Sequence, residues 1–416
     1  MTGAHSHVDV PASRRTRLLL ALLLAPFVGL TALGLVALWP SSTHVDLEDF
    51  GPPEQLFDAS IVELHEGPCQ GTPTEADLAC SQATVQLNEG PDAGNRRLLA
   101  EQPTTATQPL EVGDHIVLAY FPNSPPEFQY AFADRQRRGP LYLLIGLFTA
   151  VVLVFGRWRG LRALIGLVVS GMVVIVFILP ALLEANSPLA VALTGSAAIA
   201  LVALYLAHGF TVATTTAVLG TLVSLGLVGF LGSVFVGAAD FTGLATEEAT
   251  YLQLTAGQID LQGLLLAGIV IGALGVLDDV TVTQVSAVWE LRRANPALRR
   301  WDLYASAVRI GRDHIASTVN TLVLAYAGAS LPLLLLFTQA NQGLTDVLNG
   351  EAVAVEVVRA LVGSIGLVCS VPITTALAAV VVTASTGAPA SQASDPRRFW
   401  TRRERSIWGE AVSEEP

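Results

Sequence analysis

The chain has 416 residues, of which 52% are hydrophobic and only 14% are charged, and its formal net charge at pH 7 is −12. About a quarter of the residues of a soluble protein are charged, so this composition excludes an ordinary soluble protein. The apolar residues also fall in blocks of about 20, the length that crosses a bilayer, and predict an α-helical integral membrane bundle.

The first predicted element is a transmembrane helix at residues 18–39, after a cytoplasmic tail at residues 1–17. Arg14, Arg15 and Arg17 precede the apolar run, as in a signal peptide. The run is longer than the apolar part of such a peptide, and no clear cleavage site of small residues follows it. We therefore expect an uncleaved membrane anchor.

Residues 41–138 form the one sizeable polar segment and predict a small extracytoplasmic β-rich domain, for which a barrel is one option. Short runs with alternating apolar residues indicate strands at residues 61–66, 83–87 and 115–120. Arg135, Arg137 and Arg138 end this segment. We expect these arginines to contact lipid phosphates or acidic residues of the same domain.

The chain has three cysteines, two of them in the polar segment. Cys69 and Cys80 are separated by ten residues and predict a disulfide outside the cell. A metal site is the competing interpretation, but no CxxC pattern or nearby pair of histidines supports it. Cys369 lies in an apolar run and is expected to be an inert thiol.

Seven further spans are predicted within a transmembrane domain at residues 140–383, which makes eight with the anchor. They cover residues 141–155, 163–183, 189–207, 210–236, 261–280, 317–337 and 357–382. Arginines recur on alternate sides of these spans, so the positive-inside rule places both termini in the cytoplasm, including a tail at residues 384–416. The polar stretch 242–258 would then lie outside and could cover the mouth of a cavity.

Asp278 and Asp279 are the most informative residues, because they follow an apolar run directly and lie near the cytoplasmic end of the sixth predicted span. An aspartate at the centre of a span costs about 2.5–3.5 kcal/mol. At helical spacing, Thr283 lies on the face of Asp279, while Thr281 and Gln284 lie on the face of Asp278. Such oxygen-rich faces suit a proton or a hard cation.

The segment 302–314 is typical of an amphipathic helix on the inner surface that leads into the seventh span. Asp313, His314 and Asn320 lie at its end and in the first turns of the span. If the sixth and seventh helices pack together, these residues could form one polar cluster with Asp278 and Asp279.

Each of these residues also has a purely structural interpretation. The two aspartates could mark a helix end at the membrane surface and pair with arginines 292, 293 or 312. Asp313 could pair with the arginine at 309 or 312, and His314 could be a satisfied interfacial histidine. Asn320 could simply hold two helices together. Threonines 211 and 214–216 could line a pathway or bond back to their own helix.

Small residues precede the acidic pair at Gly268, Gly272 and Gly275, a spacing that lets a neighbouring helix approach closely. Enzyme motifs are absent from the sequence: there is no lysine for a Walker A motif, no GxSxG and no HExxH. An intramembrane aspartyl protease would need a glycine directly before one acid, where this chain has Leu277. We therefore predict neither an enzyme nor a cofactor.

The stretches GVLDDVTVTQVSAVWELRRANP (275–296) and GRDHIASTVNTLVLAYAGASLPLLLL (311–336) resemble the YibE/F-like family of bacterial multipass membrane proteins. The resemblance extends over roughly residues 58–383. It implies a bacterial inner-membrane protein and directs attention to the acidic and polar positions named above. It implies no particular activity.

These features favour a permease or transporter-like protein. Transport could be coupled to protons or cations, and the acidic cluster would then provide the coupling. In such a mechanism Asp278 or Asp279 binds and releases the ion, and Asp313 or His314 tunes its affinity. The alternative is a non-enzymatic assembly or sensory factor whose outer domain binds an envelope partner. The expected partners are the lipid bilayer and, as an option, a second copy of the chain. We expect no binding of nucleic acid, and the sequence does not identify the ion or solute.

Overall fold

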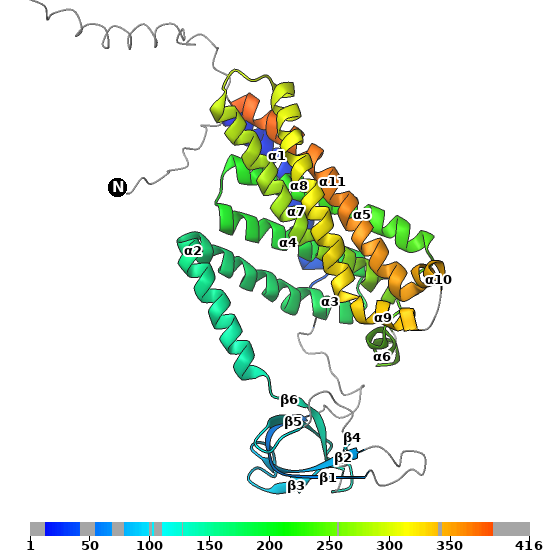
Figure 1. Ribbon diagram of the computed structural model, residues 1–416. Coiled ribbons are helices and arrows are strands. Elements are labelled where there is room, and N and C mark those ends of the chain that lie inside the picture. The colour runs from blue at the N-terminus through cyan, green and yellow to red at the C-terminus, as the bar shows by residue number, and fades with distance from the viewer. Residues whose placement is uncertain are drawn as a thin grey trace, which may run out of the picture. The chain divides into compact units, whose positions relative to one another are not determined.

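The computed structural model describes residues 13–41, 55–68, 79–99, 102–103, 110–126, 128–255, 258–339 and 343–385. The chain forms two compact units. One is His44–Leu164, and the other combines Met1–Thr43 with Ile165–Pro416. The first contains a small antiparallel sheet, and the second is helical (Figure 1).

The sheet has six strands with the order β3-β2-β1-β5-β6, and β4 pairs with β2. The strands are β1 (Gln55–Pro68), β2 (Ala79–Leu87), β3 (Arg96–Leu98), β4 (Gln102–Pro103), β5 (His115–Tyr120) and β6 (Tyr130–Arg135). Alternate residues such as Ile61, Val85, Ile116 and Leu118 are fully buried and form the core of this unit. The three strands predicted from alternation are confirmed within β1, β2 and β5.

The three arginines that end the sheet segment pair with acidic residues of the same unit. Arg135 lies 3.3 Å from Asp114, Arg137 lies 2.6 Å from Asp134, and Arg138 lies 3.1 Å from Asp58. The sequence predicts that these arginines contact either lipid phosphates or acidic residues of the same domain, and the contacts with acidic residues are present.

Asp92 illustrates the same pairing. Its carboxylate receives hydrogen bonds from Arg97 at 2.9 Å and from the Tyr130 hydroxyl at 3.2 Å. Burial and the neighbouring carboxylate raise the pKa of Tyr130 to about 12, so this tyrosine remains a hydrogen-bond donor at ordinary pH. Cys80 is disulfide-bonded and Cys369 is free. Cys69 lies outside the described residues, so its pairing with Cys80 stays a prediction.

Within the described ranges, six helices are long and apolar enough to cross a membrane. The helical elements are α1 (Arg14–Ala37), α2 (Arg138–Val173), a π-helical turn (Val174–Ile178), α3 (Leu179–Leu183), α4 (Pro188–His208), α5 (Val212–Ala238), α6 (Glu247–Thr255), α7 (Leu261–Ala294), α8 (Arg300–Ala329), α9 (Leu331–Gln339), α10 (Leu344–Asn349) and α11 (Glu351–Ser385).

Three of the eight predicted spans take a different form in the structure. The spans at 141–155 and 163–183 belong to one helical stretch of 46 residues, Arg138–Leu183. Its backbone leaves helical geometry at Arg157, with φ of 49° and ψ of −130°. The span at 317–337 falls across the end of α8 and the start of α9. The amphipathic segment 302–314 is continuous with the first part of that span, because nothing between Arg300 and Ala329 interrupts the helix.

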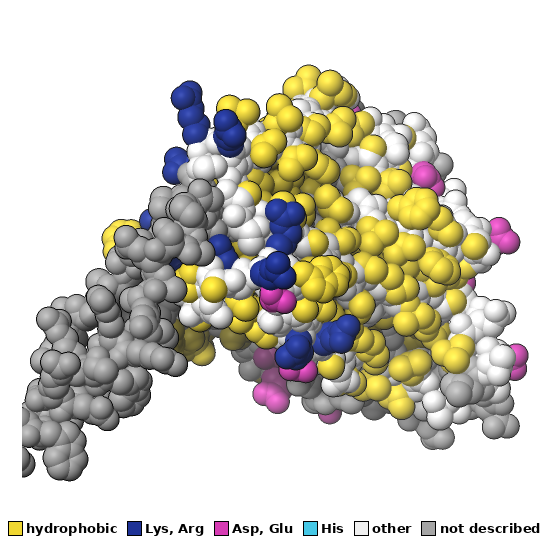
Figure 2. All heavy atoms as spheres, turned by 90° about the horizontal axis from the view of Figure 1, so that it is seen from above, with side chains coloured by type: hydrophobic (Ala, Val, Ile, Leu, Met, Phe, Trp, Pro, Cys, Tyr) yellow, Lys and Arg dark blue, Asp and Glu magenta, His cyan; other side chains and the backbone are white. Residues whose placement is uncertain are grey.

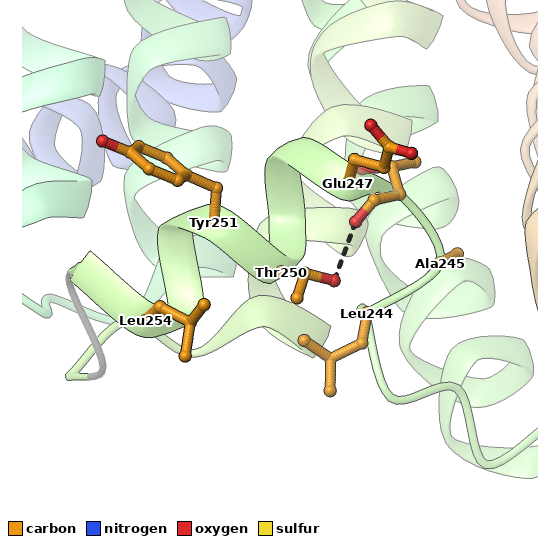
Figure 3. A pocket seen from close by; sticks show the side chains of 7 residues that line it. Leu244, Ala245, Glu247, Thr250, Tyr251 and Leu254 are labelled. Carbon is orange, nitrogen blue, oxygen red and sulfur yellow. Dashed lines mark hydrogen bonds between the residues drawn. The ribbon is translucent and has the colours of Figure 1, made fainter. Parts of the chain in front are cut away.

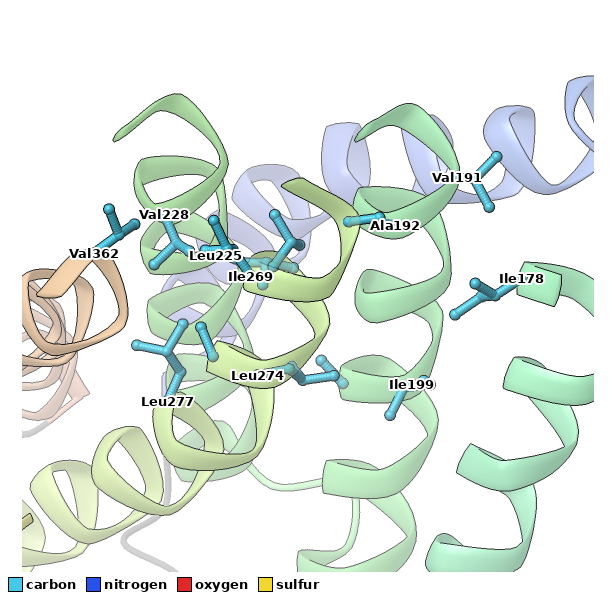
Figure 4. Packing of buried hydrophobic residues seen from close by; sticks show 14 of the residues in the cluster. Ile178, Val191, Ala192, Ile199, Leu225, Val228, Ile269, Leu274, Leu277 and Val362 are labelled. Carbon is cyan, nitrogen blue, oxygen red and sulfur yellow. The ribbon is translucent and has the colours of Figure 1, made fainter. Parts of the chain in front are cut away.

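The centre of the helical unit is the interface between α5, α7 and α11, with α4 packed beside α5 and α7. Leu225 and Val228 of α5, Ile269 and Leu277 of α7 and Val362 of α11 belong to one buried cluster (Figure 4). Gly366 of α11 permits this approach, since a Cβ atom there would collide with Val228. α11 also contains Pro372, which has no N–H and leaves the Val368 carbonyl without its usual backbone donor.

The two ends of the helical unit differ in charge. One end carries the start of α1, the end of α7 and the start of α8, which pack together around Leu20, Trp289 and Leu303. Its arginines are Arg14, Arg15, Arg17, Arg292, Arg293, Arg299 and Arg300. Figure 2, seen from above, shows arginine side chains among hydrophobic ones on this face.

The opposite end is held by carboxylates that accept hydrogen bonds from loop residues. Glu184 accepts from the backbone N–H and the hydroxyl of Ser41, each at 2.8 Å. Glu351, at the start of α11, accepts from the N–H groups of Thr242 and Gly243 at 2.8 Å. These contacts connect the ends of helices that are distant in sequence.

Candidate functional site

Asp278 and Asp279 lie in the middle of α7, which begins at Leu261 and continues to Ala294. The helix therefore continues well beyond the span predicted at residues 261–280, and the position of the pair relative to the membrane surface stays a prediction. The helix continues because the following residues include no proline or glycine until Pro296, and because Arg292 and Arg293 favour the negative end of the helix dipole. The pair consequently does not mark the end of a helix.

One of the two carboxylates, that of Asp279, approaches His314 of α8. The His314 Nε2 atom lies 3.9 Å from the Asp279 Oδ2 atom, too far for a hydrogen bond. The Nε2 atom is itself buried without a hydrogen-bond partner, and so is the Oδ1 atom of Asp278. Asp279 has 73% of its side chain exposed and His314 has 37%. The site thus combines inward-facing atoms without partners with an accessible carboxylate.

No arginine of the described residues neutralises this pair. Arg292 donates to the Leu298 carbonyl at 2.7 Å, and Arg293 lies 2.9 Å from Glu290. Neither forms an ion pair with Asp278 or Asp279, contrary to the structural interpretation of the sequence. Within the described part of the chain, no group of three or more His, Cys, Asp or Glu side chains could hold a metal ion.

Thr281 and Gln284 point to a different neighbourhood, the interior of the bundle. Both are fully buried. The hydroxyl of Thr281 lies 2.7 Å from that of Thr221 in α5, and the Gln284 Oε1 atom accepts from Thr375 in α11 at 3.0 Å. Gly311 of α8 also packs here, because a Cβ atom at this glycine would lie 2.6 Å from the Gln284 Nε2 atom. We call Thr221, Thr281, Gln284 and Thr375 the interior polar cluster.

The remaining predicted residues do not join either group. Thr283 is half-buried, and no hydrogen bond involves its side chain within the described residues. Asp313 and Asn320 are exposed on the face of α8 opposite its packed residues. The predicted single cluster therefore divides: Asp279 lies next to His314, with Asp278 adjacent in the chain, and Asp313 and Asn320 point away. No ion pair of the described residues involves Asp313.

The threonines at the start of α5 have local roles. Thr211 caps the helix by accepting from the N–H of Thr214 at 3.0 Å. Thr215 and Thr216 donate back to carbonyls four residues earlier, at 2.9 and 2.8 Å. The interpretation that these hydroxyls bond within their own helix is confirmed.

Sequence reasoning missed a second polar group on the α7–α8–α11 side. Arg359 of α11 lies 2.7 Å from Glu356, and each side chain is about three-quarters buried, with exposed fractions of 27% and 24%. Arg359 and the Tyr326 hydroxyl also approach the small-residue face of α7, at Gly268 and Gly272. The available signal was an arginine inside the run predicted as the last span.

Gly268 and Gly272 therefore accommodate polar side-chain ends, whereas the sequence predicted close approach of a whole helix. Gly275, the third member of that stripe, has open space around it, since a Cβ atom added there would have no neighbour within 4 Å. Closer helix contacts involve other glycines, such as Gly220 against Thr374 and Gly232 against Leu266.

A shallow hollow lies along α6, which occupies part of the stretch expected to cover a cavity. Leu244, Tyr251 and Leu254 line it, and its one charged side chain is Glu247 (Figure 3). Thr250 donates to the backbone carbonyl of Thr246 at 3.1 Å, so this hydroxyl stabilises the helix itself. The hollow offers no convergent set of polar groups, and it has no contact with the acidic pair in the described structure.

Comparison with known proteins identifies the family. No curated protein and no solved structure matches the chain. The sequence profile described as "YibE/F-like protein" matches residues 144–384, which begin after the strands and include α4, α5, α7, α8 and nearly all of α11. The match thus leaves out the sheet, which the resemblance seen in the sequence had included. It covers more than half of the chain and contains Asp278, Asp279 and His314, and the chain belongs to the YibE/F-like family of proteins.

Proposed function

We propose that this protein is a permease or transporter-like membrane protein in which Asp278, Asp279 and His314 bind and release a proton or a small cation. The observation that carries the proposal is the position of two adjacent carboxylates in the middle of an apolar helix, beside a histidine and without a neutralising arginine among the described residues. Ionisable groups at such positions are costly and commonly mark ion pathways.

The depth of the site supports an intramembrane function. Thr281 lies one turn beyond Asp278 and contacts Thr221, nine residues after the start of α5. Nine residues of helix rise about 14 Å. If α5 begins at the membrane surface, the acidic pair lies near the middle of a hydrocarbon layer about 30 Å thick.

Polar groups at a second depth also support a pathway. Glu356, Arg359 and Tyr326 lie toward the acidic end of the unit, several turns from Asp279. Apolar side chains of one buried cluster, including Val276 and Val319, lie between the two levels. Two polar levels with an apolar layer between them would let an ion reach one level at a time.

We further propose eight membrane crossings, with both termini in the cytoplasm. The stretch Arg138–Leu183 would be about 69 Å long as one straight helix, which is more than one crossing needs. The break at Arg157 divides it into two, and α8 with α9 supplies the eighth crossing. The arginine-rich end of the helical unit would face the cytoplasm of a bacterial cell, and the sheet unit would be extracytoplasmic.

In this mechanism Asp279 is the accessible ion-binding group, and His314 senses its charge. The His314 Nε2 atom lies 3.9 Å from the Asp279 carboxylate, close enough for the interaction between them to change when an ion binds or leaves. Asp278 adds a second carboxylate beside Asp279, and its Oδ1 atom is buried without a hydrogen-bond partner.

The first test is ion binding by the purified full chain in detergent. Thermal stability is measured in a panel of monovalent and divalent cations at several pH values, for the wild type and for Asp279→Asn. We expect one ion, or pH alone, to shift the melting temperature of the wild type and to lose this effect in Asp279→Asn. Asp302→Asn, an exposed acid in the first turn of α8, is the matched control and should respond as the wild type does.

The second test is flux in vesicles reconstituted with the same three proteins. With the active ion imposed as a gradient, the wild type and Asp302→Asn should dissipate it, and Asp279→Asn should not. An equal thermal response in all three proteins would refute the ion site. Ion binding without flux would refute transport and favour a sensory or assembly function.

A further inference from the structure

α8 has an exposed stripe that no described element covers. Its residues recur with alternating separations of four and three positions: Asp313, Ser317, Asn320, Leu324 and Ala327. The first four are exposed and Ala327 is half-buried. The packed face of α8, with Ala307, Gly311 and Leu322 buried, lies on the opposite side of the helix.

This stripe lies level with the apolar middle of the bundle. Ile315 and Val319 of α8 pack against Leu367, which lies near the centre of the 35-residue helix α11. Asn320, adjacent to Val319, therefore projects outward from the middle of the bundle. Lipid offers no hydrogen bonds to an amide at that level, so an uncovered Asn320 would be unfavourable.

We propose that a second copy of this chain covers the stripe through its own α8, related by a two-fold axis normal to the membrane. This inference does not depend on the proposed transport activity, but it rests on the proposed membrane crossing by α8 and α9. A separation of 3.5 residues on average is the spacing at which two parallel helices pack side by side. In such an isologous contact each stripe residue meets its own counterpart.

The chemistry of the stripe is complementary to itself. The Asn320 amide has both donors and an acceptor, so two copies can bond to each other across the axis, and a single polar residue in such a seam fixes the register. Ser317 and Ala327 are small enough for the two helices to approach closely. At one end of the stripe the two Asp313 carboxylates meet, and the exposed Arg312 beside each can reach the aspartate of the other copy and offset their repulsion.

Disulfide formation between two copies tests this surface. In a Cys369→Ala background, a single cysteine is introduced by Ser317→Cys or Leu324→Cys, and membranes are oxidised before denaturing electrophoresis. Both variants should form a cross-linked dimer. Val323→Cys is the matched control, because it is exposed at the same level but points away from the stripe; it should stay monomeric.

A second measurement addresses Asn320 directly. Asn320→Leu should shift the purified protein from dimer to monomer in light scattering, while its thermal unfolding stays cooperative because the residue is exposed. Equal cross-linking at position 323 would show random collision and overturn the proposal. Rapid labelling of Ser317→Cys by a membrane-impermeant maleimide, without cross-linking, would show a water-facing stripe and would also overturn it.

Discussion

α7 presents two polar faces that are built in opposite ways. On one face, Thr281 and Gln284 are completely buried and bond to Thr221 and Thr375 of neighbouring helices. On the other face, Asp279 is largely exposed and the nearest ionisable atom, on His314, lies 3.9 Å away. Neutral hydroxyl and amide groups thus join the helices, and the charged groups are left without partners.

This difference separates stability from function along a single helix. Buried polar groups stabilise a membrane bundle only when each finds a partner, as the interior polar cluster largely does. Uncompensated carboxylates stabilise nothing, and proteins keep such groups where they perform a task. Substitutions on the two faces should therefore change stability in opposite directions.

The largest effect is expected at Gly311, which packs against the interior polar cluster. A valine there would meet Gln284 and Val371, since even a Cβ atom would lie 2.6 Å from each. Overpacking of this kind costs about 1–3 kcal/mol, and we expect a clearly lower melting temperature. Gly275→Ala is the control, because no atom lies within 4 Å of its Cβ position, and it should be neutral or slightly stabilising. Equal effects at both glycines would contradict the described packing.

A smaller loss is expected for Gln284→Leu, which removes the acceptor of the Thr375 hydroxyl. An unsatisfied buried hydroxyl costs about 1 kcal/mol or somewhat more. The double variant Gln284→Leu/Thr375→Val should recover part of this loss, because neither polar partner then remains. Thr283→Val, at a half-buried position, should change the melting temperature little. Strict additivity in the double variant would show that the two side chains do not interact.

The smallest change, and one of opposite sign, is expected for Asp278→Asn. The amide keeps the shape of the carboxylate and removes a charge whose Oδ1 atom is buried without a partner. The melting temperature should therefore stay the same or rise, while any response to pH or cations weakens. A marked fall in stability would mean that the carboxylate has a structural partner, and would place Asp278 with the interior polar cluster.

Much of the architecture could be predicted from the sequence, because hydropathy blocks and strand alternation are local signals. The strands at 61–66, 83–87 and 115–120 and the helix at 302–314 are present where their patterns indicate them. The helix α7 continues 14 residues beyond the span predicted at 261–280, since hydropathy falls at Asp278 although the helix does not stop there. A helix ends where its backbone hydrogen-bonding pattern ends, and amino-acid composition indicates that position only indirectly.

The candidate site could be predicted only in part, because helical spacing is also a local signal. Spacing along a helix correctly separates the face of Asp278 and Gln284 from that of Asp279, but it cannot show what covers each face. Asn320 groups with the aspartates in the sequence because spacing alone does not reveal which side of α8 is packed. Arg359 escapes notice because it lies only two residues inside the last predicted span, where an arginine is easily taken for a flank.

Pro372 marks the turn at which α11 can bend at the lowest cost. The Val368 carbonyl already lacks its backbone donor, so a bend at this turn breaks no further backbone hydrogen bond of the helix. Thr374 and Thr375 follow directly, and they contact α5 and α7. A rocking movement of the last part of α11 would therefore loosen the centre of the bundle from one side while Glu351 keeps the other end of the helix anchored.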